Sequence, residues 1–238
     1  TGRMVDAVHL PVDAAVGVVP AIEAAYLRRG HQLTRDASSY FARFFAPTKA
    51  LEYWNKSTLL APALMAANTF IRPRTTVRFG TIEPVTQFRP EWDATWKRLL
   101  RASYEFFGKR DANFLNYKLA QPNREYHSCL HRDRDGAIDG YLVFRRARHL
   151  AKDMDLVKIC DFAGSPSALR DLFAHAMRFA TTEARGTYGI VGLSSQLDAP
   201  AFRSAGMYVA RPYPVVVAAG VAGRIRVSFF DSDLDDLW

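Results

Sequence analysis

Three residues of metal-binding type, His127, Cys129 and His131, stand at alternate positions in the middle of the chain. In a β-strand, side chains two positions apart point to the same face, so this spacing can bring two imidazoles to one metal ion. No fourth ligand stands nearby in the sequence. Ordinary packing in a hairpin explains the same pattern, and we favour that interpretation and predict no metal site.

The two cysteines and the arginine-rich runs offer two further kinds of chemistry. Cys129 and Cys160 are too few for a disulfide framework and are typical of a reducing cytosol, so we expect a cytoplasmic protein. Neither has an adjacent histidine or a helix start that would mark a nucleophile. The runs RRARH and RPRTTVR can contact phosphates, but solvated hairpin ends and a linker explain them better, and we expect no nucleic-acid partner.

Composition places the chain among globular proteins. It has 238 residues, of which 49% are hydrophobic and 24% charged, enough for one large domain or two smaller ones. The net charge of +8 favours an anionic partner such as a nucleotide cofactor, an acidic carrier protein, RNA or a membrane surface. A generally basic surface without a specific partner is the equally weighted alternative. The run 59–67 has about half the length of a membrane-spanning helix, so no span is expected.

The first part of the chain predicts alternating strands and helices. We expect a strand over 4–10, a helix over 12–30 that Gly30 closes, and an aromatic strand over 38–46. A helix that starts at Pro47 and an extended segment over 58–73 complete this part. The chain begins Thr1-Gly2-Arg3 without a methionine or a signal peptide, so we expect a processed product or a fragment.

The second part has clearer signals. After a Pro- and Arg-rich linker, with a short strand near 75–79, the sequence predicts helices over 89–107 and 111–121 and a hairpin around Asp135-Gly136. A strand, a long helix, a strand, a short helix and a strand follow: 154–164, 165–186, 187–195, 199–206 and 207–217. We expect a last strand and an acidic end over 226–238.

This order of elements resembles the fold of the GCN5-related N-acetyltransferases (GNAT), in particular tandem GNAT-like proteins encoded near bacterial polysaccharide and capsule genes. The segments that carry the resemblance are RDANFLNYKLAQPNREYHSCL, LVKICDFAGSPSALRDLFAHAM, VDAVHLPVDAAVGVVPAI and FFAPTKALEYW. It implies an α/β (α+β) protein of two GNAT-like copies, with mixed central sheets flanked by helices. Residues 1–74 would be the C-terminal half of a first copy truncated at its N-terminus, 75–90 a linker and 91–238 the second copy.

The resemblance also implies a site for acetyl-CoA or another acyl-CoA between two splayed parallel strands. The pyrophosphate would bind backbone amides at the start of the following helix. The usual loop of the family is Arg or Gln, two residues, Gly, one residue, then Gly or Ala, and AAVGVV keeps only the first glycine. The implied cofactor-binding residues are His9, Leu10, Gly17 and Val18 in the first copy and Phe162, Gly164 and Ser165 in the second.

Acyl transfer to an amine needs a base for the ammonium and an acid for the leaving thiolate. By the resemblance, Asp161 is the candidate carboxylate and Tyr208 the candidate acid, while a structural aspartate and a packed tyrosine are their alternatives. The implied function is an N-acyltransferase that takes its acyl group from acyl-CoA or an acyl carrier protein and passes it to an amine such as an amino sugar. A degenerate, non-catalytic binding module is the first alternative. An aminoacyl-tRNA-dependent transferase ranks last, because no heptad run predicts a coiled-coil arm.

Overall fold

A computed structural model describes residues 14–16, 27–28, 30–53, 56–70, 75–105, 107–122, 124–149, 153–184 and 186–217, together with 224, 226, 228 and 230. The predicted strand over 4–10, most of the predicted helix over 12–30 and residues 231–238 lie outside this part of the chain. So do His9, Leu10, Gly17 and Val18.

One eight-stranded sheet runs through the described residues in the order β1-β8-β2-β7-β6-β5-β4-β3. Neighbouring strands are antiparallel, except that β6 and β7 are parallel. The structure is therefore a mixed α/β fold, as the sequence predicts. The strands are β1 (Ala14–Val16), β2 (Gln32–Phe44), β3 (Thr81–Val85), β4 (Tyr126–Arg132), β5 (Ile138–His149), β6 (Met154–Gly164), β7 (Gly189–Ser195) and β8 (Tyr208–Val217).

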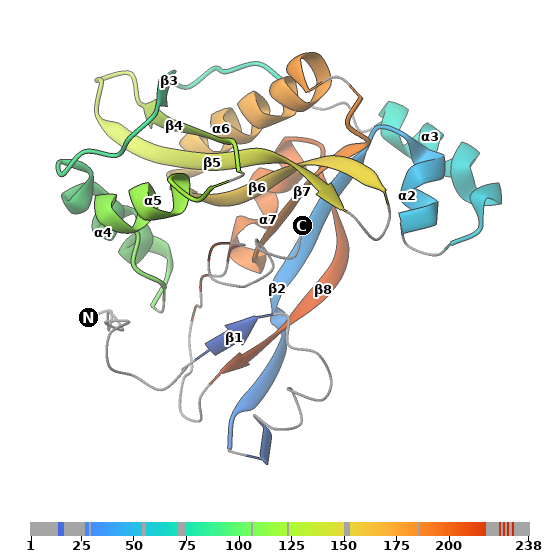
Figure 1. Ribbon diagram of the computed structural model, residues 1–238, viewed down its shortest axis with the longest axis horizontal. Helices are drawn as coiled ribbons and strands as arrows, with labels where there is room; N and C mark the ends of the chain where they lie inside the picture. The colour runs from blue at the N-terminus through green and yellow to red at the C-terminus, as the bar shows by residue number, and fades with distance from the viewer. Residues whose placement is uncertain are drawn as a thin grey trace.

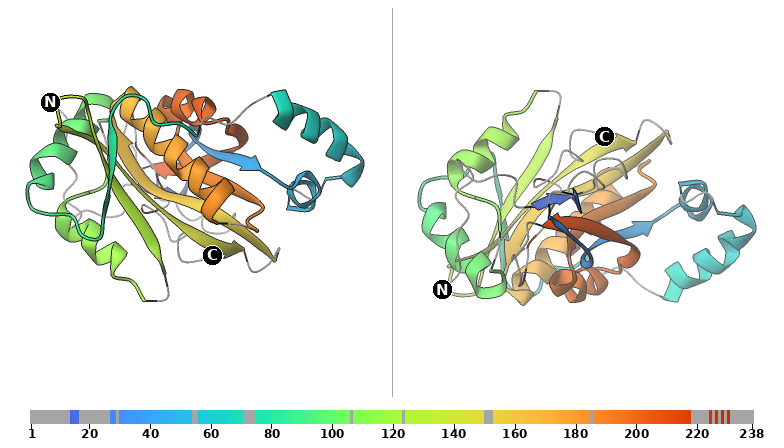
Figure 2. Two further views of the ribbon diagram at one scale, coloured as in Figure 1. Left: turned by 90° about the horizontal axis from the view of Figure 1, so that it is seen from above. Right: turned by 90° about the horizontal axis from the view of Figure 1, so that it is seen from below.

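Helices cover both faces of the β3 to β7 part of the sheet (Figures 1 and 2). On one face, Trp92 and Trp96 of α4 pack with Tyr141 and Val143 of β5. On the other, α6 and α7 pack against Phe144, Ile159 and Phe162. The helices are α2 (Pro47–Tyr53), α3 (Ala61–Phe70), α4 (Trp92–Ser103), α5 (Ala112–Leu119), α6 (Pro166–Arg178) and α7 (Ala199–Ser204), and a π-helical turn, Phe179–Glu183, continues α6.

Strand β2 comes from the region of the predicted first copy, yet it lies between β7 and β8, which belong to the predicted second copy. Its residues 38–44 pair along the whole of β7, and Ala42 pairs with Tyr208 at the start of β8. The buried side chains of Tyr40, Phe41 and Phe44 explain why this aromatic segment forms a central strand. Residues from both predicted copies therefore build one sheet.

Local sequence signals explain most elements of the second part. Ser165 caps α6 by accepting a hydrogen bond from the amide of Ala168, and Pro166 occupies the first helical position. Gly136 has a φ of +83°, which the turn between β4 and β5 requires. Helix α5 ends at Leu119, before Pro122, as predicted.

Three expectations are wrong. Residues 58–73 were expected to be extended, but their described part is a short 3-10 turn, Thr58–Leu60, followed by α3, because Ala, Leu and Met favour a helix. Residues 14–16 lie in the predicted helix 12–30, but they form β1, which pairs with the end of β8. The linker strand lies at Thr81–Val85 and not at 75–79, and Pro84 is tolerated because β3 is the edge strand.

Candidate functional site

Strands β6 and β7 pair only over their first halves. The parallel pairs run from Leu156 and Gly189 to Ile159 and Gly192, although β6 continues to Gly164 and β7 to Ser195. The outer neighbours remain paired over these second halves, β5 with β6 as far as Gly164 and β2 with β7 as far as Ser195. The two strands therefore separate within an otherwise continuous sheet, and each has a backbone edge there that the other does not pair.

A shift of register in β6 accompanies this separation. Val143 pairs with Asp161, but the next residue, Phe144, pairs with Ile159, so Cys160 is the extra residue of a bulge. A bulge bends and twists its strand and re-aims the side chains around it. The sheet thereby directs β6 away from β7 at the position where Asp161 stands.

Asp161 lies at the centre of a buried ionic cluster. Its Oδ2 is 2.5 Å from Nε of Arg110, which precedes α5, and 2.5 Å from the hydroxyl of Tyr141 on β5. Its Oδ1 is 2.8 Å from Nη2 of Arg226. Although burial raises the pKa of this carboxyl, the two guanidinium groups and the tyrosine hydroxyl outweigh burial and lower the pKa to about 2. Asp161 is thus a fully buried anion with an unusually weak tendency to accept a proton.

Arg226 also occupies the free edge of β6. Its Nη2 donates a hydrogen bond to the backbone carbonyl of Phe162, which lies beyond the last β6–β7 pair. The guanidinium stacks over the Phe162 ring at 5.3 Å from the ring centroid. A side chain that follows β8 in the sequence thus takes up an acceptor that an added strand or ligand would use.

Two of the amides at the start of α6, the predicted pyrophosphate site, are already bonded. The amide of Ser165 donates to the carbonyl of Asp139, and the amide of Ala168 donates to the Ser165 hydroxyl. That hydroxyl donates in turn to the Asp139 carboxylate at 2.7 Å. Gly164 packs so tightly that a Cβ would lie 3.0 Å from the carbonyl of Asp139. A carboxylate therefore stands at this helix N-terminus, in the place favoured for an anion.

A second buried polar cluster follows the end of β7. The carboxylate of Asp198 accepts hydrogen bonds from the hydroxyls of Ser194 and Tyr104, the latter at 2.5 Å. The Tyr104 hydroxyl also lies 3.1 Å from that of Ser195. Burial raises the pKa of Asp198 and, together with the nearby carboxylate, that of Tyr104. Asp198 is consequently a better proton acceptor than an ordinary aspartate.

Tyr208, the predicted acid, is not near Asp161. It opens β8, which β2 and β7 separate from β6, so three strand spacings of roughly 5 Å each lie between them. Its neighbour is Arg43 on β2, which bonds to the carbonyl of Gly206 at 2.9 Å. Burial raises the pKa of the Tyr208 phenol. The structure brings Asp161, Phe162, Gly164 and Ser165 together on β6 and at the start of α6, but it does not bring Tyr208 to them.

His127, Cys129 and His131 lie on the α6 side of β4, as their spacing predicts. They have separate surroundings: His127 stacks on Phe144, Cys129 is buried in the apolar core, and His131 bridges Asp139 and Asp171. Over the part of the chain that the structure describes, no three His, Cys, Asp or Glu side chains are arranged to hold a metal ion.

Sequence reasoning missed most members of the two clusters, among them Tyr104, Arg110, Asp198 and Arg226. Arg110 stood in the Arg-Asp pair that opens a segment quoted for the resemblance, so a signal for it was present. Tyr104 and Asp198 carried no signal of their own, because they meet only when α4 packs beside the end of β7. Arg226 stood in a segment expected to be a plain strand.

Comparison with known proteins gives similarity at the level of structure. No family model and no curated protein matches the chain. The GCN5-related N-acetyltransferase from Anabaena variabilis ATCC 29413 is 15% identical, with a TM-score of 0.49 over 86% of this chain and 45% of that one. A conserved protein of unknown function from Enterococcus faecalis V583, described as a probable N-acyltransferase, is 12% identical, with a TM-score of 0.48 over 85% of this chain and 44% of that one.

A third similar structure is the N-myristoyltransferase of Saccharomyces cerevisiae with bound myristoyl-CoA and inhibitors. It is 10% identical, with a TM-score of 0.45 over 79% of this chain and 51% of that one. The chain thus spans about half the length of each of these three proteins. Within the described residues, no helix has the length and apolar character needed to cross a membrane. At TM-scores below 0.5 these similarities do not assign a family.

Proposed function

We propose that the chain belongs to an N-acyltransferase of the GNAT type, which moves an acyl group from acyl-CoA or an acyl carrier protein to an amine such as an amino sugar. The observation that carries the proposal is the separation of β6 and β7 beyond Ile159 and Gly192. The amide groups of a pantetheine arm can pair with the free edge of β6 there, as an added strand would. A tandem arrangement, acetyl-CoA as the donor and a cytoplasmic location remain parts of the proposal.

The reaction forms a C–N bond between the amine and the acyl carbon and breaks the C–S bond of the thioester. The ammonium proton must leave before the attack, and the thiolate must be protonated after it. We assign the first task to Asp198, whose raised pKa suits a proton acceptor, and make Tyr104 its positioning residue. Asp161, with a pKa of about 2, then holds the end of β6 in place. Tyr208 as the acid that protonates the thiolate remains a prediction.

A second function, a non-catalytic binding module with a GNAT-like fold, has its own supporting observation. The groups that an acyl-CoA would use, the carbonyl of Phe162 and the amides of Ser165 and Ala168, all have partners within the chain. A donor must displace Arg226 to reach the carbonyl. If displacing Arg226 costs more free energy than donor binding gains, no acyl-CoA binds at this edge.

Calorimetric titration of the full-length protein with CoA, acetyl-CoA and a longer acyl-CoA tests the proposal. Thiol release from each donor in the presence of glucosamine and other amines then measures turnover. Saturable binding with amine-dependent thiol release supports the acyltransferase. Binding without release for any amine supports the non-catalytic module, and no binding at millimolar donor rejects an acyl-CoA site.

A further inference from the structure

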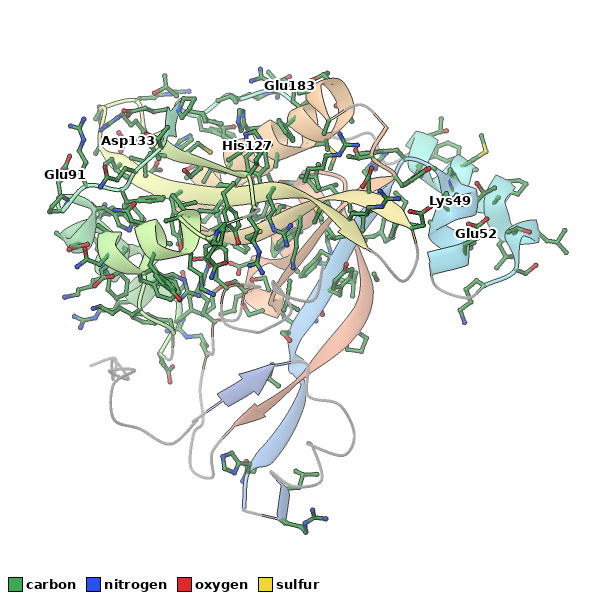
Figure 3. All side chains as sticks on the ribbon, in the orientation of Figure 1. Lys49, Glu52, Glu91, His127, Asp133 and Glu183 are labelled. Carbon is green, nitrogen blue, oxygen red and sulfur yellow. The ribbon has the colours of Figure 1, made fainter. Side chains whose placement is uncertain are left out.

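A pocket of about 430 Å³ lies between the start of β4 and the end of α6. Phe144 of β5, Phe179 of the π-helical turn, and the histidines His127 and His175 contribute to its wall. Glu183, the last residue of that turn, lines it too, and Figure 3 labels His127 and Glu183 in the upper part of the view. The π-helical turn at the end of α6 thus borders this pocket, and π-helical turns occur frequently at functional sites.

The aromatic rings of this wall contact one another. The ring centroids of His127 and Phe144 are 5.2 Å apart, and the two rings are almost parallel, at 17°. The ring centroids of His127 and Phe179 are 4.5 Å apart. The ring centroid of Phe144 lies 5.1 Å from that of Phe179 and 5.9 Å from that of His175. Phe144 is buried, whereas His127 is exposed, so the cluster reaches from the core to the surface. Aromatic rings carry negative partial charge on their faces, so such a wall can attract a cation that enters the pocket.

The formal charge at the pocket is negative. Among the described residues that line it, Glu183 is the single carboxylate, and neither lysine nor arginine is present. Burial and then Arg178 lower the pKa of His175, which favours the neutral imidazole, and Glu183 opposes the shift only partly. Arg178 contacts Nδ1 of His175 at 3.4 Å but does not line the pocket. Arg124 and Arg145 contact Tyr126 in the same way without lining the pocket. The described lining of the pocket therefore combines one carboxylate with several aromatic rings and has no lysine or arginine.

We propose that this pocket binds an organic monocation, a quaternary ammonium or a protonated alkylamine, which lies against the rings of Phe179 and His127 and is paired with the carboxylate of Glu183. Cations of this kind are attracted to the faces of aromatic rings, and a carboxylate at the rim adds charge complementarity. A neutral ligand of the same shape gains only the apolar contact.

The pocket is separate from the proposed acyl-transfer site. Asp161 bonds to Tyr141, whose ring packs on Trp92 of α4, whereas Phe144 faces α6 on the other side of the sheet. Strand β5 pairs with β6 on one edge and β4 on the other, so the pocket also lies away from the β6–β7 separation. The cation site therefore does not depend on the function proposed for the acyl site.

The test compares choline with 3,3-dimethyl-1-butanol, its neutral analogue, in an NMR titration of the histidine ring protons. The signals of His127 and His175 are assigned with His127→Gln and His175→Gln. We expect choline to shift both signals saturably and the neutral analogue to bind more weakly. Glu183→Gln should weaken choline binding by roughly three- to tenfold, because it keeps the shape but removes the charge.

Glu91→Gln is the matched control, since Glu91 is exposed beside α4, outside the pocket, and is labelled at the left of Figure 3. It should leave choline binding unchanged. Equal binding of the two ligands, equal effects of the two Glu→Gln variants, or no shift of either histidine signal at tens of millimolar choline would each overturn the proposal. Donor titrations of Glu183→Gln should match those of the wild type, so the outcome is independent of acyl-CoA binding.

Discussion

Arg226 holds Asp161 and the free edge of β6 at once: its Nη2 lies 2.8 Å from Oδ1 of Asp161 and also donates to the backbone carbonyl of Phe162. Asp161 is charged and fully buried, so it needs such partners, and Arg110 supplies the second. The ion pair that stabilises the end of β6 therefore also covers the backbone on which the proposed donor would pair. The contacts of Arg226 that stabilise the folded protein therefore also hinder access of an acyl-CoA to the β6 backbone.

Replacing Arg226 tests that opposition directly. In Arg226→Met, the carbonyl of Phe162 loses its donor and becomes available to a pantetheine amide. We expect acyl-CoA to bind several-fold more tightly than to the wild type, measured by calorimetry. In urea unfolding, the free energy of unfolding of the same variant should be lower by about 2 kcal/mol, because Asp161 keeps Arg110 and Tyr141 but loses one charged hydrogen-bond partner.

Arg148→Met is the matched control for this experiment, because Arg148 is exposed and pairs with Asp153 at the surface. It should change neither donor affinity nor, by more than about 0.5 kcal/mol, stability. If both arginine variants bound acyl-CoA more tightly, the cause would be the lower net charge and not the freed carbonyl of Phe162. If Arg226→Met bound acyl-CoA more weakly, Arg226 would itself be part of the donor site.

Asp161 should give the protein a characteristic loss of stability in acid. Its pKa in the folded state is lowered from 3.8 to about 2. A lowered pKa means that the stabilisation is complete above the unfolded pKa of about 4 and is lost as the pH falls toward 2. Urea unfolding between pH 6 and pH 2 should show about 2 kcal/mol of acid-dependent loss in the wild type that Asp161→Asn lacks.

At neutral pH, Asp161→Asn should be destabilised by about 3–5 kcal/mol, because it leaves two buried guanidinium groups without an anion. Asp135→Asn, at the exposed tip of the β4–β5 turn, should match the wild type. A variant at position 161 that is as stable as the wild type, with the same acid profile, would show that the ionic cluster contributes nothing.

Tyr104 should set the pH at which the proposed base works. Its hydroxyl donates to Asp198, and this hydrogen bond lowers a pKa that burial has raised. Tyr104→Phe removes the donor, so the pKa of Asp198 should rise and the acidic limb of the kcat/KM profile should move to higher pH. Tyr117→Phe, at an exposed position of α5, should leave the profile unchanged. A fall in rate without a shift of the limb would exclude Asp198 as the group that titrates.

Much of the fold could be predicted from the sequence, because helix caps, turn glycines and prolines determine local structure. The capping Ser165, the turn glycine Gly136 and Pro122 after α5 each act within a few residues, and the structure has the expected element at each. The strands that pair with β2 could not be predicted. Its aromatic residues predict a buried strand but do not say that it pairs with β7 and β8, which lie about 150 residues or more further along the chain.

The site was readable only in part, for the same reason. The resemblance singled out Asp161 on a buried strand, yet the pKa of its carboxyl depends on Arg110 and Arg226, which are distant in sequence. Tyr208 was predicted from its place after a short helix, but strand order puts it three strands from Asp161. Charges and hydroxyls that meet through tertiary packing leave no spacing pattern, so side-chain roles need the sheet order first.

The bridge made by His131 offers a test of how β3 is held to the fold. Its Nδ1 lies 2.5 Å from Asp139 and its Nε2 3.3 Å from Asp171, and the Asp171 carboxylate accepts the amides of Arg78 and Phe79 just before β3. His131→Leu would leave two carboxylates facing an apolar side chain, so we expect a loss of roughly 2–4 kcal/mol in urea unfolding.

The same variant should also lose hydrogen-exchange protection at the amides of Arg78 and Phe79, because Asp171 is then free to turn away from them. His127→Gln, four residues earlier on the same strand but exposed, should keep that protection and change stability by less than about 1 kcal/mol. Unchanged protection of both amides in His131→Leu would mean that Asp171 holds the segment without the histidine. The buried imidazole would then be a packing residue, and β3 would be held by its pairing with β4 alone.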